Sequence, residues 1–258
     1  YHEGYYGLGR LYSVSQKIHW SWGALRGSSQ ERYQSAFTRL PLVQQIQILK
    51  ASGFSGVTVE RRAFPDNGTD FEGQLQKLGL KPQLNSPDGC LVYYPLDNPP
   101  AMNQAESQRT FEEKLIALTW NGGNLDFGRT GWGNLYLRTG WSDPEDDGYW
   151  TVQKSGFLRL PRPPGQQAEV GVRMLVYPYI GRPKVQRVQI FQDGKPLAWF
   201  EFRKGQPHWV HFNATLPALL EMRVERPTQP SFEFEADTRS LGLKVKRLEI
   251  VEPFAKPY

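Results

Sequence analysis

From about Gly131 to its end, the sequence consists of short aromatic and β-branched runs separated by Pro and Gly turns. The turns recur at intervals of about ten residues, a spacing typical of antiparallel β-sandwiches and jelly rolls. Asp193-Gly194 is the clearest hairpin turn among them. The candidate strands are 150–152, 156–160, 169–177, 186–192, 196–203, 208–213, 219–225 and 243–251.

The first half has a different pattern, in which helical and strand signals alternate. Pro41 begins a segment with apolar residues at helical spacing, and Gly53 is placed to end it as a C-cap. The segment after Gly53 is β-branched, as expected of a strand. The pattern predicts a helix at 41–52, a strand at 54–59, a helix at 69–77, a strand at 90–94 and a connecting helix at 104–120.

These patterns predict an α/β module at 1–125 followed by an all-β, jelly-roll-like sandwich at 126–258, an α+β organisation overall. A chain of 258 residues with 39% hydrophobic and 13% aromatic residues can bury a sizeable core in each part. The sequence begins with Tyr1 rather than Met, so we expect it to be part of a longer chain.

Composition argues against several classes of protein. No stretch approaches the roughly 18 to 20 apolar residues of a membrane helix, so we expect a soluble region. The single cysteine, Cys90, excludes an internal disulfide framework and a thiolate zinc cluster. The net charge of +5 comes from scattered Lys and Arg residues without a recognisable nucleic-acid module, so no nucleic-acid partner is expected.

Several motifs carry a likeness to a known group of proteins. In the second half they are Gly140-Trp141-Ser142-Asp143-Pro144-Glu145 with Trp150, the hairpin 189–195 with Trp199 and Phe202, and 237–243. In the first half they are 20–23, 53–57, Glu60-Arg61-Arg62 and 86–89. On these motifs the chain resembles the C-terminal soluble region of bacterial GT-C-type polytopic membrane glycosyltransferases and related envelope membrane proteins. Glu60 departs from the pattern, which has Asp at that position.

The resemblance implies a non-catalytic accessory region at the periplasmic face of the bacterial inner membrane. It implies that the parent enzyme transfers a sugar and that this region binds or positions a glycan acceptor or a polyprenyl-linked sugar. The membrane-embedded part of the same chain would be its other partner. The alternatives are a structural module that docks onto another envelope protein and a self-contained carbohydrate-active enzyme.

The candidate ligand-binding residues lie in the second half, at Trp141, Glu145, Trp150, Tyr177 and Tyr179. An aromatic face can stack on a sugar ring, and a carboxylate can bind its hydroxyl groups. The alternative is architectural, because a tryptophan beside a Pro-containing turn also packs over a sandwich edge while the carboxylate satisfies an arginine or backbone N–H groups.

Asp237 and Arg239 are two residues apart, so on a strand they would share a face. There an arginine can form a bidentate bond with a carboxylate such as Glu145 or Glu235. We interpret Asp237 and Arg239 as members of a structural ion pair.

No residue is assigned to catalysis or to a metal. The standard nucleophile, phosphate-binding and metalloprotease motifs are missing from the sequence. His208 and His211 are three apart, which would place them on opposite faces of a strand. No cofactor is expected, and the acidic run Asp143–Asp147 leaves calcium as an alternative.

Overall fold

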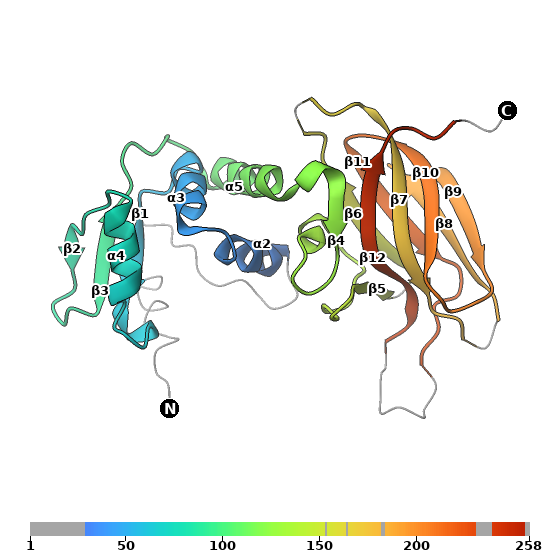
Figure 1. Ribbon diagram of the computed structural model, residues 1–258, viewed down its shortest axis with the longest axis horizontal. Helices are drawn as coiled ribbons and strands as arrows, with labels where there is room; N and C mark the ends of the chain where they lie inside the picture. The colour runs from blue at the N-terminus through green and yellow to red at the C-terminus, as the bar shows by residue number, and fades with distance from the viewer. Residues whose placement is uncertain (1–28, 153, 164, 182–183, 231–238, 256–258) are drawn as a thin grey trace. The chain divides into compact units, whose positions relative to one another are not determined.

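The computed structural model describes residues 29–152, 154–163, 165–181, 184–230 and 239–255 (Figure 1). The chain divides into two compact units, Tyr1–Ile116 and Ala117–Tyr258. An α/β module followed by a β-sandwich is the architecture that the sequence predicts.

The first unit combines helices with a small antiparallel sheet. Its helices are α2 (Ser29–Thr38), α3 (Leu42–Ala51), α4 (Thr69–Lys77) and α5 (Gln104–Thr119), with a 3-10 turn at Arg61–Ala63. Its strands are β1 (Gly56–Glu60), β2 (Leu84–Asn85) and β3 (Leu91–Pro95), in the order β1-β3-β2. The predicted helices and strands are confirmed, whereas α2 and the two-residue β2 were not predicted.

The core of the first unit joins α3, α4 and the sheet. Gly53 ends the α3 segment with a φ of 79°, a left-handed conformation that glycine adopts without a steric penalty. The chain then turns into β1, and the helices place their apolar faces on the same cluster. Its buried members are Ile46, Val59, Leu75, Leu80, Val92, Tyr94 and Leu96.

The second unit is a sandwich of two antiparallel sheets. One sheet has the order β10-β7-β12-β4, with β5 also paired to β12, and the other has the order β6-β11-β8-β9. Figure 1 shows β12, β7 and β10 side by side. The strands are β4 (Asn124–Asp126), β5 (Tyr149–Val152), β6 (Ser155–Leu160), β7 (Glu169–Pro178), β8 (Gln186–Gln192), β9 (Lys195–Phe202), β10 (His208–Thr215), β11 (Ala218–Val224) and β12 (Leu241–Val251).

Every strand predicted in the second half is present, with ends that differ by at most a few residues. The predicted hairpin joins β8 to β9, and Asp193 and Gly194 have φ values of 49° and 81°. Positive φ at both central residues is the signature of a type I′ turn, whose twist matches that of the flanking strands. Alternate residues of β7 are buried between the sheets, among them Val170, Val172, Met174 and Val176.

The boundary between the units differs from the predicted one at 125/126. The division lies between Ile116 and Ala117, within α5. The reason is that β4 pairs with β12 and so belongs to the sandwich. A three-residue strand followed by glycines gives too weak a periodic signal to be recognised in the sequence.

Candidate functional site

The outward face of the five-stranded sheet carries two of the five predicted ligand-binding side chains, Trp150 and Tyr177. Buried and accessible residues alternate along β7 and β12, so the accessible ones share the face that points away from the second sheet. We call this surface the outer face. Its polar and aromatic members include Asn124, Asp126, Trp150, Arg173, Tyr177, Trp209, Lys244, Lys246, Arg247 and Glu249.

At one end of the outer face, Glu145 is the centre of a polar cluster. Trp150 donates a hydrogen bond from Nε1 to Oε2 of Glu145 over 3.1 Å. Lys244 Nζ lies 2.6 Å from the same oxygen, and Arg239 Nη2 lies 3.3 Å from Oε1. The Trp150 ring meets the Tyr179 ring edge-on, with centroids 6.0 Å apart. Three of the five predicted ligand-binding residues are therefore brought together.

Lys244 is the cation that holds this cluster together. Its side chain is only 12% exposed, and Nζ also lies 2.7 Å from Oδ1 of Asp147 and 5.0 Å from the centre of the Trp150 ring. Burial acts to lower the pKa of Lys244, but the hydrogen bonds to Asp147 and Glu145 outweigh it and the pKa is raised. Hydrogen bonds from Lys244 and Lys246 in turn lower the pKa of Asp147. Lys244 and Asp147 are therefore both charged at neutral pH.

The other predicted residues lie elsewhere. Trp141 donates its indole N–H to the Phe157 carbonyl over 2.8 Å and packs against Gly156 of β6, so its ring is fixed by the second sheet. Tyr177 is on the outer face, with Lys246 Nζ 5.2 Å from its ring centre. Asp237 lies outside the described residues. Arg239, its predicted companion, pairs with Glu145, one of the two partners that the sequence suggested.

A pocket of about 360 Å³ lies at the other end of the outer face, beside the edge strand β4. Its lining is mostly polar side chains with one indole ring, a composition suited to a hydroxyl-rich ligand. The lining residues are Asn121, Asn124, Asp126, Thr130, Gly131, Trp132 and Arg247.

Tight packing of a glycine-rich loop shapes this pocket. The Asp126 carboxylate accepts a hydrogen bond from the Gly128 N–H over 2.7 Å, which turns the chain directly after β4. Gly131 then passes so close to β4 that a Cβ atom there would lie 2.1 Å from the Asp126 carbonyl oxygen. Only glycine permits this approach, which places Trp132 next to the polar side chains of β4.

Several polar groups of the pocket are not used by the fold. Arg247 donates from Nε to Oδ1 of Asn124 over 3.0 Å and pairs through Nε with Glu249. Within the described residues its two Nη atoms, the Asn124 amide nitrogen and the Asn121 side chain have no hydrogen-bond partner. The pocket thus presents donors and an acceptor, Asp126, that a ligand can satisfy.

This pocket is not apparent from the sequence. Its residues come from two segments, 121–132 and β12, that only the pairing of β4 with β12 brings together. The run Asn121-Gly122-Gly123-Asn124-Leu125-Asp126 is nevertheless a signal, since it combines planar polar side chains with turn-forming glycines.

Two of the acidic residues at Asp143–Asp147, where the sequence leaves calcium as an alternative, contact cationic side chains. Asp147 binds the ammonium groups of Lys244 and Lys246, and Asp146 pairs with Arg129 over 3.2 Å. Among the residues that the structure describes, no group of three or more His, Cys, Asp or Glu is placed to hold a metal ion.

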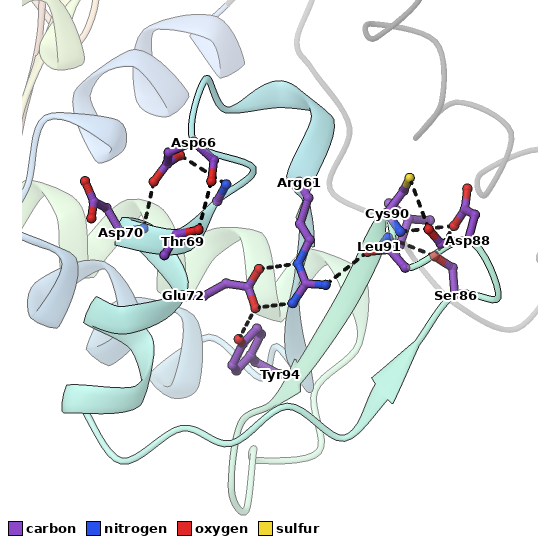
Figure 2. Close-up of polar contacts among 12 residues, drawn as sticks. Arg61, Asp66, Thr69, Asp70, Glu72, Ser86, Asp88, Cys90, Leu91 and Tyr94 are labelled. Carbon is purple, nitrogen blue, oxygen red and sulfur yellow. Dashed lines mark hydrogen bonds and ion pairs between the residues drawn. The ribbon is translucent and has the colours of Figure 1, made fainter.

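The first unit contains a second polar cluster, centred on Glu72 of α4 (Figure 2). Arg61 donates to both carboxylate oxygens, over 2.5 and 2.8 Å, and the Tyr94 hydroxyl donates to Oε2 over 2.7 Å. The hydrogen bonds from Arg61 lower the pKa of Glu72, and burial with the Glu72 contact raises the pKa of Tyr94 to about 12. Each group satisfies another, so the cluster joins α4 to the sheet and offers no free ligand site.

Asp66 has a structural role in the same region. Its two carboxylate oxygens accept hydrogen bonds from the Gly68 and Asp70 N–H groups at the start of α4, over 3.1 and 2.8 Å (Figure 2). These contacts satisfy backbone donors that a helix leaves unpaired in its first turn. His208 and His211, on β10, belong to no group of three or more potential metal ligands within the described part of the chain. In the same residues, no helix has both the length and the apolar character needed to cross a bilayer.

Comparison with known proteins gives only distant similarities. No protein-family model and no curated protein matches the sequence. Among solved structures, the CBM36-1 domain of a multidomain xylanase from the hindgut metagenome of Trinervitermes trinervoides is similar at 11% identity and a TM-score of 0.28, over 46% of this chain and 88% of that one.

Two further carbohydrate-binding modules are similar to the same degree. A CBM36 module in complex with calcium and xylotriose has 13% identity and a TM-score of 0.27, over 50% of this chain and 95% of that one. A module from Cellvibrio mixtus lichenase 5A in complex with cellotriose has 7% identity and a TM-score of 0.26, over 51% and 97%. At these scores the comparisons assign the chain to no family.

Proposed function

We propose that this chain is a non-catalytic region that binds glycan through the pocket beside β4. The observation that carries the proposal is the set of unused polar groups around that pocket, on Asn121, Asn124 and Arg247, beside the Asp126 carboxylate. Sugar hydroxyl groups donate and accept hydrogen bonds in directions that planar amide, carboxylate and guanidinium groups match. Trp132 supplies an aromatic surface for the apolar face of a sugar ring.

The wider role that we propose follows from the resemblance of the sequence motifs. The region would serve a membrane glycosyltransferase at the periplasmic face of the bacterial inner membrane, holding a glycan acceptor or a polyprenyl-linked sugar near the catalytic part of the same chain. Its contribution to the reaction is proximity, because a tethered site raises the effective concentration of the acceptor without supplying an acid, base or nucleophile.

The Glu145 cluster has a supporting part in this proposal. Glu145, Trp150 and Lys244 satisfy one another, so a ligand would have to replace existing contacts in order to bind them. We therefore assign direct contacts to the pocket beside β4. The predicted residues Trp150 and Tyr179 then fix the loop and strand geometry at the far end of the outer face.

The test is a glycan-array screen of the chain, followed by calorimetric titration of the glycans that bind. Arg247→Ala removes an arginine whose side chain is 47% exposed in the pocket, and Arg187→Ala removes one that is 54% exposed on the other sheet. We expect Arg247→Ala to weaken binding by about tenfold or more, since hydrogen bonds to charged groups contribute about 1.5–3 kcal/mol. Arg187→Ala should bind as the wild type does.

A second variant, Asn124→Ser, removes one amide of the pocket and should weaken binding in the same direction. Failure of the wild-type chain to bind any envelope glycan would overturn the proposal. Equal affinity of folded Arg247→Ala and wild type for the glycan would exclude the pocket beside β4 as the binding site.

A further inference from the structure

A second concave surface lies on the other sheet, around its edge strand β6. This groove encloses about 510 Å³, a volume within the range of small-ligand sites. Four separate segments of the sandwich build it: the loop before β5, β6 itself, the β8–β9 turn and the start of β11. The lining residues are Arg138, Thr139, Phe157, Arg159, Asp193, Pro217, Ala218 and Leu219.

The floor of the groove is apolar. Phe157 and Arg159 lie two residues apart on β6 and so share one face of the strand, and Leu219 of β11 is the direct partner of Arg159. Leu219 is 40% exposed, although the residues on either side of it, Ala218 and Leu220, are buried. Together with Pro217 these side chains offer a surface for the C–H face of a sugar ring.

Two guanidinium groups stand at this floor. Arg138 is held in place, because its Nη1 donates to the carbonyl oxygens of Leu135 and Leu137, each over 3.2 Å. Arg159 is exposed, and in the described part of the chain it has neither a hydrogen bond from its side chain nor an ion pair. A cation without a counter-charge beside a second cation favours an anionic ligand.

Asp193, the one carboxylate among the described residues that line the groove, does not neutralise Arg159. Asp193 Oδ1 accepts from the Leu219 N–H over 3.2 Å, and Oδ2 accepts from the Gln192 amide over 3.3 Å. These contacts tie the hairpin turn to β11 and to the end of β8, and no ion pair between Asp193 and Arg159 exists among the described residues. The groove therefore retains positive charge over an apolar floor.

We propose that this groove is a second glycan subsite, which takes a sugar residue carrying an anionic group such as a carboxylate or a phosphate. The inference rests on the proposed glycan-binding function and adds a substrate class to it. The sugar ring would lie on Phe157 and Leu219, and its anionic group would bind Arg159 and Arg138. An arginine fork matches both carboxylate and phosphate oxygens in a bidentate geometry.

The experiment compares three probes on the whole chain by calorimetry: a galacturonate oligosaccharide, the neutral galactose oligosaccharide of the same length and galactose 6-phosphate. We expect one or both anionic probes to bind about tenfold or more tightly than the neutral one. The preference should diminish as salt is raised from about 0.05 to 0.5 M, because the Debye length falls below the size of the groove. The two anionic probes distinguish a carboxylate ligand from a phosphate ligand.

Two variants with the same change in charge test whether the preference for anionic probes arises in the groove. Arg159→Gln should remove the preference for the anionic probes, while Arg162→Gln, an exposed arginine outside the groove, should leave it unchanged. An anionic preference that persists in folded Arg159→Gln would overturn the proposal, as would equal affinity of the wild type for all three probes. Arg247→Ala tests the two sites separately. If binding of the neutral glycan is lost in Arg247→Ala and retained in Arg159→Gln, the pocket beside β4 is supported, whatever the result for the groove.

Discussion

Trp150 and Glu145 are joined by a 3.1 Å hydrogen bond from the indole N–H to the carboxylate, five residues apart across the turn that precedes β5. The bond orients the carboxylate so that Lys244 of β12 and Arg239 contact it as well. One local contact and two long-range contacts thus depend on the Glu145 side chain. The Glu145 cluster is therefore a structural element of the sandwich, and its contribution to the free energy of unfolding can be measured.

Removal of Lys244 should destabilise the sandwich. Lys244→Ala leaves Glu145 and Asp147 without their most buried counter-charge, and we expect a loss of about 1–3 kcal/mol in the free energy of unfolding. Chemical denaturation measures the loss. The matched control is Arg187→Ala, which removes a more exposed cation of β8 and its ion pairs with Glu201 and Glu225 and should change stability little. A smaller effect for Lys244→Ala than for the control would contradict the assigned role.

The Tyr94 hydroxyl should make the free energy of unfolding depend on pH in the alkaline range. Its pKa is raised to about 12, so the folded state retains the proton while the unfolded state, with a pKa of about 10, loses it. The associated stability is fully present below about pH 10 and is lost as the pH rises towards 12. Tyr94→Phe should cost about 1–2 kcal/mol at neutral pH, because the hydrogen bond to Glu72 is removed.

The same variant provides the decisive comparison. Since Phe does not titrate, the stability difference between wild type and Tyr94→Phe should shrink steadily as the pH rises from about 10 towards 12. Urea denaturation at a series of pH values measures it. A difference that stays constant from pH 7 to 11.5 would show that the folded state does not hold the tyrosine proton.

Glu72 should control stability in the acidic range. Hydrogen bonds from Arg61 lower its pKa below the unfolded value of about 4.3, so its stabilising contribution is present above that pH and is lost as the pH falls through the folded pKa. Glu72→Gln should therefore lower the free energy of unfolding at pH 7. The further decrease in this free energy between pH 5 and 2 should be smaller in the variant than in the wild type. The control Glu113→Gln removes a carboxylate that is exposed on α5 and should leave the free energy of unfolding at pH 7 close to that of the wild type.

Two glycines should respond to alanine in opposite directions. Gly131→Ala places a Cβ 2.1 Å from the Asp126 carbonyl oxygen, so the loop must move, at a cost of about 1–3 kcal/mol and with loss of glycan binding at the pocket. Gly73 lies within α4 with open space around it, and Gly73→Ala should raise stability by about 0.5–1 kcal/mol. Thermal unfolding and glycan titration of both variants check these outcomes.

Much of the secondary structure follows from the sequence because its signals are local. The Pro41 start and Gly53 end of the α3 segment, the Asp193-Gly194 hairpin and the alternation along β7 each arise from a few neighbouring residues. Arg239 pairs with Glu145, one of the two carboxylates that the sequence suggested, because an arginine beside a strand requires an acceptor.

The sequence by itself determined the order of a helical module and a β-sandwich, most strand positions and the turn types, since backbone preferences and hydrophobic periodicity act over a few residues. Only the tertiary structure decided that β4 belongs to the sandwich, that Asn121 and Asp126 meet Arg247 in one pocket, and that Arg159 faces an apolar groove without a counter-charge. The physical reason is that strand pairing joins segments more than 100 residues apart, such as Asn124 and Arg247, which lie 123 residues apart. The energy of that pairing depends on the packed sheet as a whole and is not encoded in a short stretch of sequence.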